Sequence, residues 1–416
     1  MSSTKTTLAI VVAILVVAVS AFGAYSLLNS TDPPESSSPS ASSSPSPSSS
    51  NTPSTSPSET TSPTTNPTTT PTATPTTTPL PETIQITDMA GRTVTVPTNI
   101  TRIIAVNTGS LRLISYLGAS DLVCAVEETE ADPGNRPYAL AHPEYAILPK
   151  VGPGHGGEPE LIGAQNPDIV IKGDIDAANL DNLQTQLGVP VIGIVAPNID
   201  TTENIQQFYD ALNLVGNILH KEDRATEIIN YLDGLLADLE SRTSNIPDSE
   251  RPTVYIAGLS SRGTHGIIST TSHYSPFVLT NSKNVVTLDM TSGTTGTVNI
   301  DLEIIPNLNP DVIFVDYAGL SLCQADVANH IDVFENMNAI KNNRVYGVMP
   351  SGSYGSQPDV LLTDVYYVGS VLYPEQFANI DPVEKANEIY TFLFGMPLYE
   401  DVAEIIGSFG PVDLQP

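Results

Sequence analysis

Apolar residues between Lys221 and Arg242 recur at intervals of three and four positions, the spacing of one face of an α-helix. Acidic residues come early in this stretch and Arg242 comes late, which suits the helix dipole, and Pro247 follows the end of the pattern. A helix of about 21 residues is roughly 30 Å long. The pattern therefore predicts a helix that can cross a domain, although an ordinary surface helix has the same pattern. The apolar positions are Ala225, Ile228, Ile229, Leu232, Leu235, Leu236 and Leu239.

A short pattern stands on both sides of this helix. Glu160 to Asp168 and Glu303 to Asp311 each begin with Glu and two apolar residues, end in Asn-Pro-Asp, and lead into an apolar run. A short helix, a proline stop and a buried strand explain each segment. Two such segments flanking one long helix predict two similar lobes joined by a rigid connector, whereas chance similarity between common helix-strand units is the alternative.

Short apolar runs alternate with amphipathic stretches elsewhere, which predicts an α/β fold with mostly parallel sheets. A hairpin is expected over 84–96, and a capping box at Asp200 and Glu203 predicts the start of a helix. The other expected strands cover 103–106, 122–126, 168–172, 190–194, 253–257, 285–286, 312–315 and 344–348. The other expected helices cover 110–117, 177–187, 275–280, 357–372 and 381–394.

The first 82 residues differ in composition from the rest. An uncharged apolar run from Leu8 to Leu28 is long enough to span a bilayer, so 1–29 is expected to be an N-terminal membrane anchor or a cleaved signal peptide. Residues 30–82 are mostly Ser, Thr and Pro, which predicts a disordered tether on the outer side of the membrane, or a secreted protein if the anchor is cleaved. The folded part then divides into a first lobe over 83–219, the linking helix over 220–246 and a second lobe over 247–416.

The charge of the chain excludes some partners. Its 416 residues include 16 Lys and Arg against 46 Asp and Glu, a net charge of −30. Nucleic acid is therefore not an expected partner, because binding phosphates requires Lys and Arg. Two cysteines, Cys124 and Cys323, are too few for a disulfide framework; free thiols and one bridge between the lobes remain alternatives.

Ligands of open α/β sheets bind beyond the carboxyl ends of the strands, so the loops there supply the candidate site. Tyr and Arg in such loops suit an anionic, aromatic or metal-chelate ligand. No catalytic motif is evident, no intrinsic cofactor or metal is expected, and we expect a binding protein and not an enzyme. The candidate ligand-binding residues are Asn107, Thr108, His155, Lys172, Arg262, His273, Tyr274, Tyr317 and Tyr354.

Two alternatives concern the same loops. The segment around His155 fits a glycine-rich nucleotide pattern as letters, but Pro153 and the lack of a preceding strand speak against it. A metal ligand pair of His155 and Glu158 is also conceivable, as is a chelated iron or haem held by His265, His273 or Tyr274. Glu160 and Glu303 begin equivalent helices, where they either complement the helix dipole or form a matched pair of docking acids.

The stretch Ile86 to Pro97, then Arg102 to Val106 and Ser115 to Ala119, resembles the opening of the iron-siderophore and cobalamin class of ABC-transporter substrate-binding proteins. The resemblance covers about Ile84 to Phe394. It implies two Rossmann-like lobes joined by one long α-helix, the class III periplasmic-binding-protein arrangement, with ligand between the lobes. It also implies docking on a permease dimer and its ATPase through one acid per lobe.

The resemblance carries the docking role over to Glu160 and Glu303, and it implies a ferric siderophore, haem or corrinoid as ligand. The chain departs from several members of the class because it has no Trp and no cysteine for lipid attachment. We therefore expect a membrane-tethered protein that captures an iron chelate or corrinoid for an importer. A haem or free-metal binder, or a surface adhesion protein with the same fold, are the alternatives.

Overall fold

The computed structural model describes residues 82–260, 263–352 and 354–414. The predicted N-terminal anchor or signal peptide, nearly all of the tether, and Arg262 lie outside the described residues. Within the described ranges, no helix is both long enough and apolar enough to cross a membrane.

The first lobe is built on a four-stranded sheet in the order β4-β3-β5-β6, with every neighbouring pair parallel. Its two central strands are buried apolar runs, apart from half-buried Lys172 at the end of one of them, as parallel strands covered on both faces require. The predicted hairpin is present as an antiparallel pair. The strands are β1 (Thr83–Thr87), β2 (Thr93–Pro97), β3 (Ile103–Val106), β4 (Val123–Ala125), β5 (Ile169–Lys172) and β6 (Val191–Gly193).

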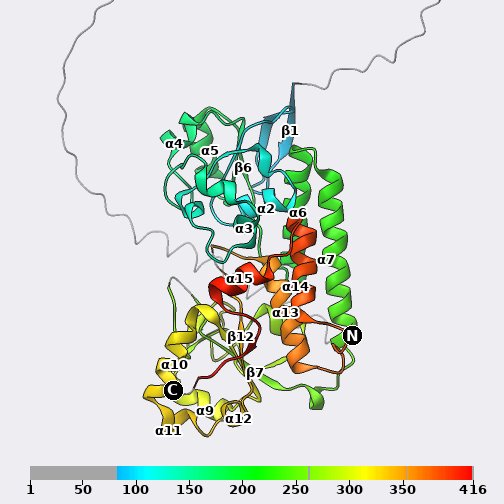
Figure 1. Cartoon of the computed structure of the whole chain (residues 1–416). Helices are drawn as coiled ribbons and strands as arrows, with labels where there is room; N and C mark the ends of the chain where they lie inside the picture. Colours follow the sequence, from blue (N-terminus) through cyan, green and yellow to red (C-terminus); the bar gives the residue numbers. More distant parts are fainter. Residues whose placement is uncertain (1–81, 261–262, 353, 415–416) are drawn as a thin grey trace, which may run out of the picture. The chain divides into compact units, whose positions relative to one another are not determined.

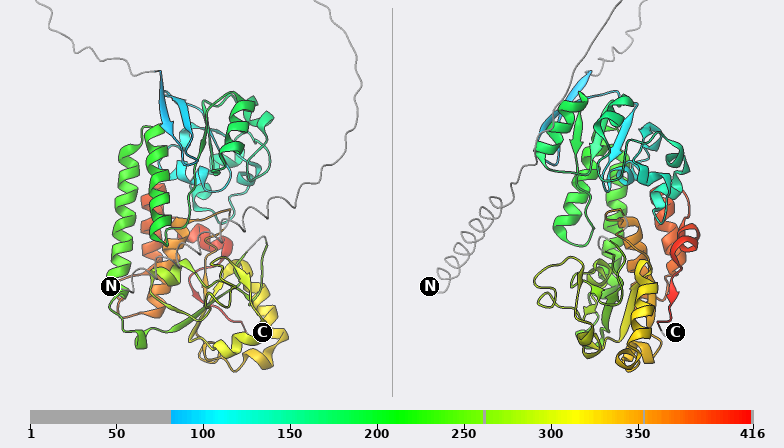
Figure 2. Two further views of the ribbon diagram at one scale, coloured as in Figure 1. Left: turned by 180° about the vertical axis from the view of Figure 1, so that it is seen from behind. Right: turned by 90° about the vertical axis from the view of Figure 1, so that its left-hand side faces the viewer.

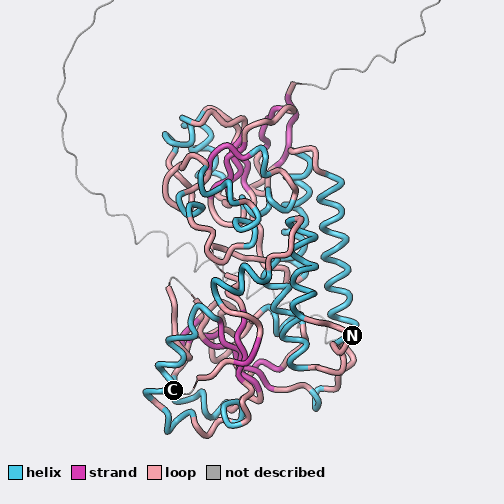
Figure 3. Tube along the Cα trace, in the orientation of Figure 1, coloured by secondary structure: helices cyan, strands magenta, loops and turns pink. Residues whose placement is uncertain are grey.

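The second lobe contains a five-stranded sheet in the order β13-β12-β11-β7-β9. All of its pairs are parallel except the edge pair of β12 with β13. Figure 3 shows the strands of the two lobes as separate groups. The predicted α/β class with two parallel-sheet lobes is therefore confirmed. The strands are β7 (Thr253–Ala257), β9 (Lys283–Asn284), β11 (Val312–Asp316), β12 (Val345–Val348) and β13 (Gly410–Pro411), with a separate ladder of β8 (Ser269–Thr270) and β10 (Val298–Asn299).

Short helices and 3-10 turns connect these strands. The strand expected at 285–286 is instead β9, two positions earlier, because Lys283 and Asn284 pair with β7. The helices in the first lobe are α2 (Ser110–Tyr116), α3 (Pro137–Ala141), α4 (Pro159–Ala164) and α5 (Ala177–Leu187). Those in the second lobe are α8 (Ser275–Leu279), α9 (Ile305–Leu308), α10 (Leu320–Asn329), α11 (Ile331–Phe334), α12 (Asn338–Lys341) and α15 (Tyr399–Ile406).

The predicted linking helix is present as α7 (Glu222–Thr243). Its expected apolar face is buried except for Ile229 and Leu236, which are half-buried. Preceding α6 (Thr202–Ile218) packs along it, and a Cβ on Gly216 would approach that of Ala225 to 2.9 Å, so glycine permits this close approach. The two helices run side by side in Figures 1 and 2.

Two further helices, α13 (Pro358–Leu372) and α14 (Pro382–Phe394), join α7 in connecting the lobes. Arg224 of α7 donates to the carbonyl of Phe392 in α14 and, at 3.1 Å, to that of Tyr116 in α2. Tyr231 of α7 stacks on the ring of Phe392 with 3.9 Å between ring centroids. Chain segments that follow β12 therefore pack against the first lobe as well as against the linking helix.

Candidate ligand-binding site between the lobes

A cavity of about 250 Å³ lies at the carboxyl ends of β7, β11 and β12, where the second lobe faces Asn198 of the first-lobe segment before α6. Its lining is rich in hydroxyl groups and glycine backbone, with Leu259 and Tyr274 as the larger apolar surfaces. A cavity at this edge of parallel strands agrees with the general position of ligands in open α/β sheets. The described lining residues are Asn198, Leu259, Thr271, His273, Tyr274, Ser275, Thr295, Gly296, Thr297, Asp316, Ser351, Gly352 and Ser356.

Asp200, from the first lobe, lies next to this cavity and binds two of its lining residues. Ser275 donates a short hydrogen bond to its Oδ2, and His273 Nε2 lies 3.5 Å from the same oxygen. The predicted capping box is wrong by one residue, because Thr201 caps α6 by accepting from the amide of Asn204, while Asp200 accepts from the side chain of Asn204. Asp200 is thereby free to hold the two lobes together beside the cavity.

The last residue of β11, Asp316, supplies a carboxyl group to the cavity lining. One of its oxygens accepts from the amide of Ala318 at 2.8 Å. Burial raises the pKa of Asp316 to about 7, although this hydrogen bond acts in the opposite direction. Asn198 donates weakly to Ser275 at 3.4 Å, and its Oδ1 has no hydrogen-bond partner among the described residues. The cavity thus offers both an ionisable acid and an unused amide acceptor.

A second contact between the lobes lies beside the cavity, at residues 354–357, which we call the bridging loop. The Tyr354 hydroxyl donates a short hydrogen bond to Oε2 of Glu127, which follows β4 in the first lobe. The same hydroxyl accepts from the amide of His155 at 3.1 Å, and the two rings lie 5.1 Å apart. Burial raises the pKa of Glu127, against the lowering effect of the hydrogen bonds it accepts.

The sequence-predicted residues thus fall into two groups. His273 and Tyr274 line the cavity, whereas His155 and Tyr354 meet at the bridging loop. Thr108 touches this loop too, because a Cβ on Gly355 would lie 2.7 Å from that of Thr108.

The side chains of three further predicted residues make contacts within their own lobes. Asn107 donates to the carbonyl of Gly173 at 2.8 Å, and Lys172 pairs with Asp174 at 3.0 Å. Tyr317 is not part of the described cavity lining, because its ring packs over the bare backbone of Gly347 and Gly407 and its hydroxyl donates to the carbonyl of Ser408.

Sequence reasoning missed Glu127, Asn198 and the cavity role of Asp200. Glu127 comes directly after the strand expected over 122–126, which is a signal that could have singled it out. Asn198 lies in the irregular segment between β6 and α6, and no local pattern distinguishes it. Asp200 was assigned to a helix cap, so its contact with the other lobe was not considered.

The two docking candidates occupy comparable exposed positions. Glu160 lies in the first turn of α4, and Glu303 lies in the 3-10 turn Leu302–Ile304 that leads into α9. Both precede a parallel central strand of their lobe, as the repeated sequence pattern predicts.

The candidate metal ligands and the two cysteines can be compared with the structure over its described residues. No group of three or more His, Cys, Asp or Glu side chains there is arranged to hold a metal ion. Cys124 and Cys323 are free thiols, so the bridge between lobes that the sequence left open is not formed. Burial raises the pKa of both thiols, that of Cys323 to about 12.

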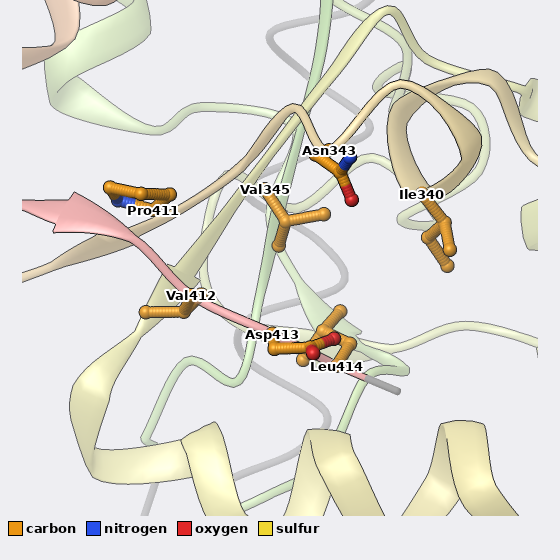
Figure 4. Close-up of a pocket in the computed structure, with 7 residues that line it drawn as sticks. All are labelled: Ile340, Asn343, Val345, Pro411, Val412, Asp413 and Leu414. Atoms are coloured by element: carbon orange, nitrogen blue, oxygen red, sulfur yellow. The ribbon is translucent and has the colours of Figure 1, made fainter. Parts of the chain in front are cut away.

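A different cavity, of about 280 Å³, lies at the opposite edge of the second sheet (Figure 4). It is next to Val345, the first residue of β12, and so lies at the amino end of the parallel strands. That edge is not where α/β sheets bind ligands, and we assign no ligand to it. Its lining is Ile340, Asn343, Val345, Pro411, Val412, Asp413 and Leu414.

Comparison with known proteins places this architecture. Residues 103–351 match the family described as periplasmic binding protein. The chain is 22% identical over 294 residues to the ABC transporter substrate-binding lipoprotein YvrC of Bacillus subtilis, covering 71% of this chain and 87% of that protein. It is 21% identical over 327 residues to the molybdate-binding protein MolA of Haemophilus influenzae, covering 73% and 89%.

Solved structures show the same fold. MolA bound to molybdate superposes with a TM-score of 0.60 at 20% identity, covering 76% of this chain and 98% of that one. A periplasmic solute binding protein from Veillonella parvula gives a TM-score of 0.61 at 18% identity, with 78% and 96% covered. The resemblance drawn from the opening signature is thus confirmed. The chain is a binding protein and not an enzyme, and it belongs to the periplasmic binding protein family.

Proposed function

We propose that this protein is the extracytoplasmic substrate-binding component of an ABC importer and that it captures an iron chelate between its lobes. The observation that carries the proposal is the polar cavity at the carboxyl ends of the second-lobe strands, facing Asn198 of the first lobe. YvrC, with which the chain aligns over 71% of its length, is a substrate-binding lipoprotein of an ABC transporter. In this proposal, the energy for transport comes from the partner ATPase.

The size and lining of the cavity support a compact, oxygen-rich ligand. Its volume of about 250 Å³ lies just below the range of about 300–1,000 Å³ that is typical of pockets for drug-sized molecules. A compact ferric chelate therefore fits better than a corrinoid, which needs the lobes to move further apart. Hydroxyl groups such as those of Thr295 and Thr297 can hydrogen-bond to the oxygen atoms that surround ferric iron.

Molybdate is the second candidate ligand. It is favoured by the similarity to MolA, which is named for binding molybdate. Against it, the described cavity lining contains Asp316 and neither Lys nor Arg, which suits a neutral or cationic ligand better than an oxyanion. We therefore rank it below an iron chelate.

Delivery requires a partner and a location. We propose that Glu160 and Glu303 dock on the two halves of a permease dimer, since both are exposed and occupy comparable places in the two lobes. The N-terminal segment 1–29 holds the protein at the outer face of the membrane, and the tether over 30–82 lets the folded part reach the permease.

Thermal unfolding of the full-length protein against a ligand panel tests the ligand class. The panel contains ferric hydroxamate and catecholate chelates, cobalamin, haem, sodium molybdate and bare metal ions. A ligand that binds only the folded state at a hundred times its Kd should raise the midpoint by roughly 4 °C or more. A rise with a ferric chelate alone supports the proposal. A rise with molybdate alone replaces the iron chelate with the second candidate, and no rise with any ligand overturns the metal-chelate assignment.

A further inference from the structure

The bridging loop contacts the first lobe at three consecutive positions. Tyr354 hydrogen-bonds to Glu127, the backbone of Gly355 touches Thr108, and the carbonyl of Ser356 accepts from Nη1 of Arg112 in α2. These contacts join residues that are more than 200 positions apart in the sequence. One short segment of the second lobe therefore holds the first lobe at three neighbouring points, in addition to the contacts described above.

Glu127 accepts hydrogen bonds from both lobes at this contact. The residue is 2% exposed, and its carboxylate accepts from the amide of Asn107 at 3.0 Å and from that of Gly156 at 2.6 Å. Both of these donors belong to the first lobe and keep the carboxylate in place when the lobes separate. The third donor, the Tyr354 hydroxyl, belongs to the second lobe, so it is the one that lobe separation removes.

The surroundings of Tyr354 include one favourable contact with the first lobe and one source of backbone strain. The guanidinium of Arg136 lies 5.8 Å from the centre of the Tyr354 ring, and Arg136 itself is held by the carbonyls of Thr129 and Asp132 in the first lobe. Tyr354 has a φ of 51°, and Gly355 a φ of 87°. A non-glycine residue in this left-handed region is strained, so the contacts with the first lobe must offset that strain.

The same loop also lines the ligand cavity. Ser356 is a lining residue, and its carbonyl is the acceptor for Arg112. Gln357 ties the loop to two neighbours, donating from its amide to Ser351 at 2.9 Å and from its side chain to Pro350 at 3.0 Å, and Ser351 also lines the cavity. A ligand that contacts this wall therefore acts on the segment that carries Tyr354.

We propose that Tyr354 and Glu127 form a latch between the lobes, and that ligand in the cavity stabilises this latch by ordering the bridging loop. Tyr354 and Glu127 are positioning residues, since the latch acts on the ligand through the cavity wall and neither side chain lines the cavity. The coupling to ligand rests on the proposed function, whereas the latch itself is a property of the protein alone. In a binding protein of this kind, the latch determines how long ligand is held after capture.

Hydrogen exchange of the full-length protein tests the latch without ligand. The amide of His155 donates to the Tyr354 hydroxyl, so the peptide that contains residues 155–156 reports on the contact. Tyr354→Phe removes only the hydroxyl and is expected to speed exchange of this peptide several-fold. Tyr317→Phe is the matched control, because it removes a tyrosine hydroxyl bonded to Ser408 within the second lobe and should leave the peptide unchanged. Equal exchange in Tyr354→Phe and the parent protein, or equally faster exchange in both variants, overturns the latch.

Ligand kinetics test the coupling, with a ferric hydroxamate chelate as the probe. The parent protein at saturating probe should exchange the 155–156 peptide more slowly than without it. Tyr354→Phe should release the probe about tenfold faster at an unchanged association rate, whereas Tyr317→Phe should release it at the parent rate. Probe that binds without protecting the peptide, or equal release rates, overturns the coupling. If the probe does not bind, the iron-chelate assignment fails, and the exchange of the ligand-free variants still decides on the latch.

Discussion

At the scale of single residues, the buried acids of the second lobe are held at an energetic cost. Asp316 is 6% exposed and Asp364 is fully buried, and burial raises the pKa of both carboxyl groups. Burial also raises the pKa of Tyr274 well above its usual range, and the nearby carboxylates of Asp364 and Asp316 act in the same direction. Such groups are favoured in their neutral form, so they link the stability of the fold to pH.

Asp316 gives this link a direction. With a folded-state pKa of about 7 and a usual value near 3.9 when unfolded, the folded protein keeps the proton longer, so stability falls as pH rises from about 4 to about 7. Asp316→Asn removes this loss and should be more stable than the parent at pH 8 by roughly 2–4 kcal/mol, with little difference at pH 4. Urea unfolding at both pH values measures it, with exposed Asp332→Asn as the control. A constant difference between the two pH values would contradict the assignment.

At the scale of elements, the repeated Asn-Pro-Asp pattern has the same structural role in both lobes. Asp168 accepts from the amides of Thr101 and Arg102, at 2.7 and 2.9 Å, and so ties the start of β5 to the segment before β3. Asp311 accepts from the amide and the hydroxyl of Thr253, at 2.9 and 2.7 Å, and ties β11 to β7. The two lobes thus use the same device to align their parallel strands.

Removing either aspartate should weaken its lobe. Asp168→Ala and Asp311→Ala each leave backbone or hydroxyl donors without a strong acceptor, which typically costs about 1–3 kcal/mol. Urea unfolding at pH 7 should show both losses, and Asp289→Ala, which changes an exposed side chain, should leave stability nearly unchanged. The Asp168 loss should shrink in acid, since hydrogen bonds from Thr101 and Arg102 outweigh burial and lower the pKa of Asp168. A loss below 0.5 kcal/mol at both sites would argue that the repeated pattern serves another purpose.

At the scale of the whole molecule, α13 and α14 bond to α7, and α14 also packs against the first lobe, so these helices join the two lobes. Tyr116 of the first lobe donates to buried Asp359 at the start of α13 at 2.8 Å. These connections limit how far the distance between the two docking candidates can change, which favours recognition of a two-fold partner.

Glu160→Ala and Glu303→Ala should therefore each weaken capture by the cognate permease, and the double variant should weaken it further. Losing one charge of a docking pair typically changes affinity by about tenfold or less at physiological salt, and the effect should decline as salt is raised. A pulldown with detergent-solubilised permease measures it. The matched control is Glu203→Ala with Glu335→Ala, which removes two exposed acids outside the repeated pattern. Equal capture of both double variants would remove the docking role.

The sequence alone determined the local and repetitive features of this protein. The period of apolar residues predicted α7, α5 and the central strands, because burial of one face requires that spacing. The opening signature and the repeated pattern predicted the lobes and the family. Two of the candidate ligand residues, His273 and Tyr274, line the cavity and belong to the long segment between β7 and α8, which follows a strand of the second sheet.

Only the tertiary structure decided how the lobes meet. Glu127 and Tyr354 are 227 positions apart, and Asp200 and Ser275 are 75 apart, so no local pattern relates the members of either pair. Tyr317 and Tyr354 both follow second-lobe strands. The ring of Tyr317 packs on glycine backbone of its own lobe, whereas the hydroxyl of Tyr354 bonds to Glu127 of the first lobe. The periodicity of apolar residues specifies which side of an element is buried. Contacts between the lobes depend on how distant segments pack against each other, and only the packing of the whole chain determines that.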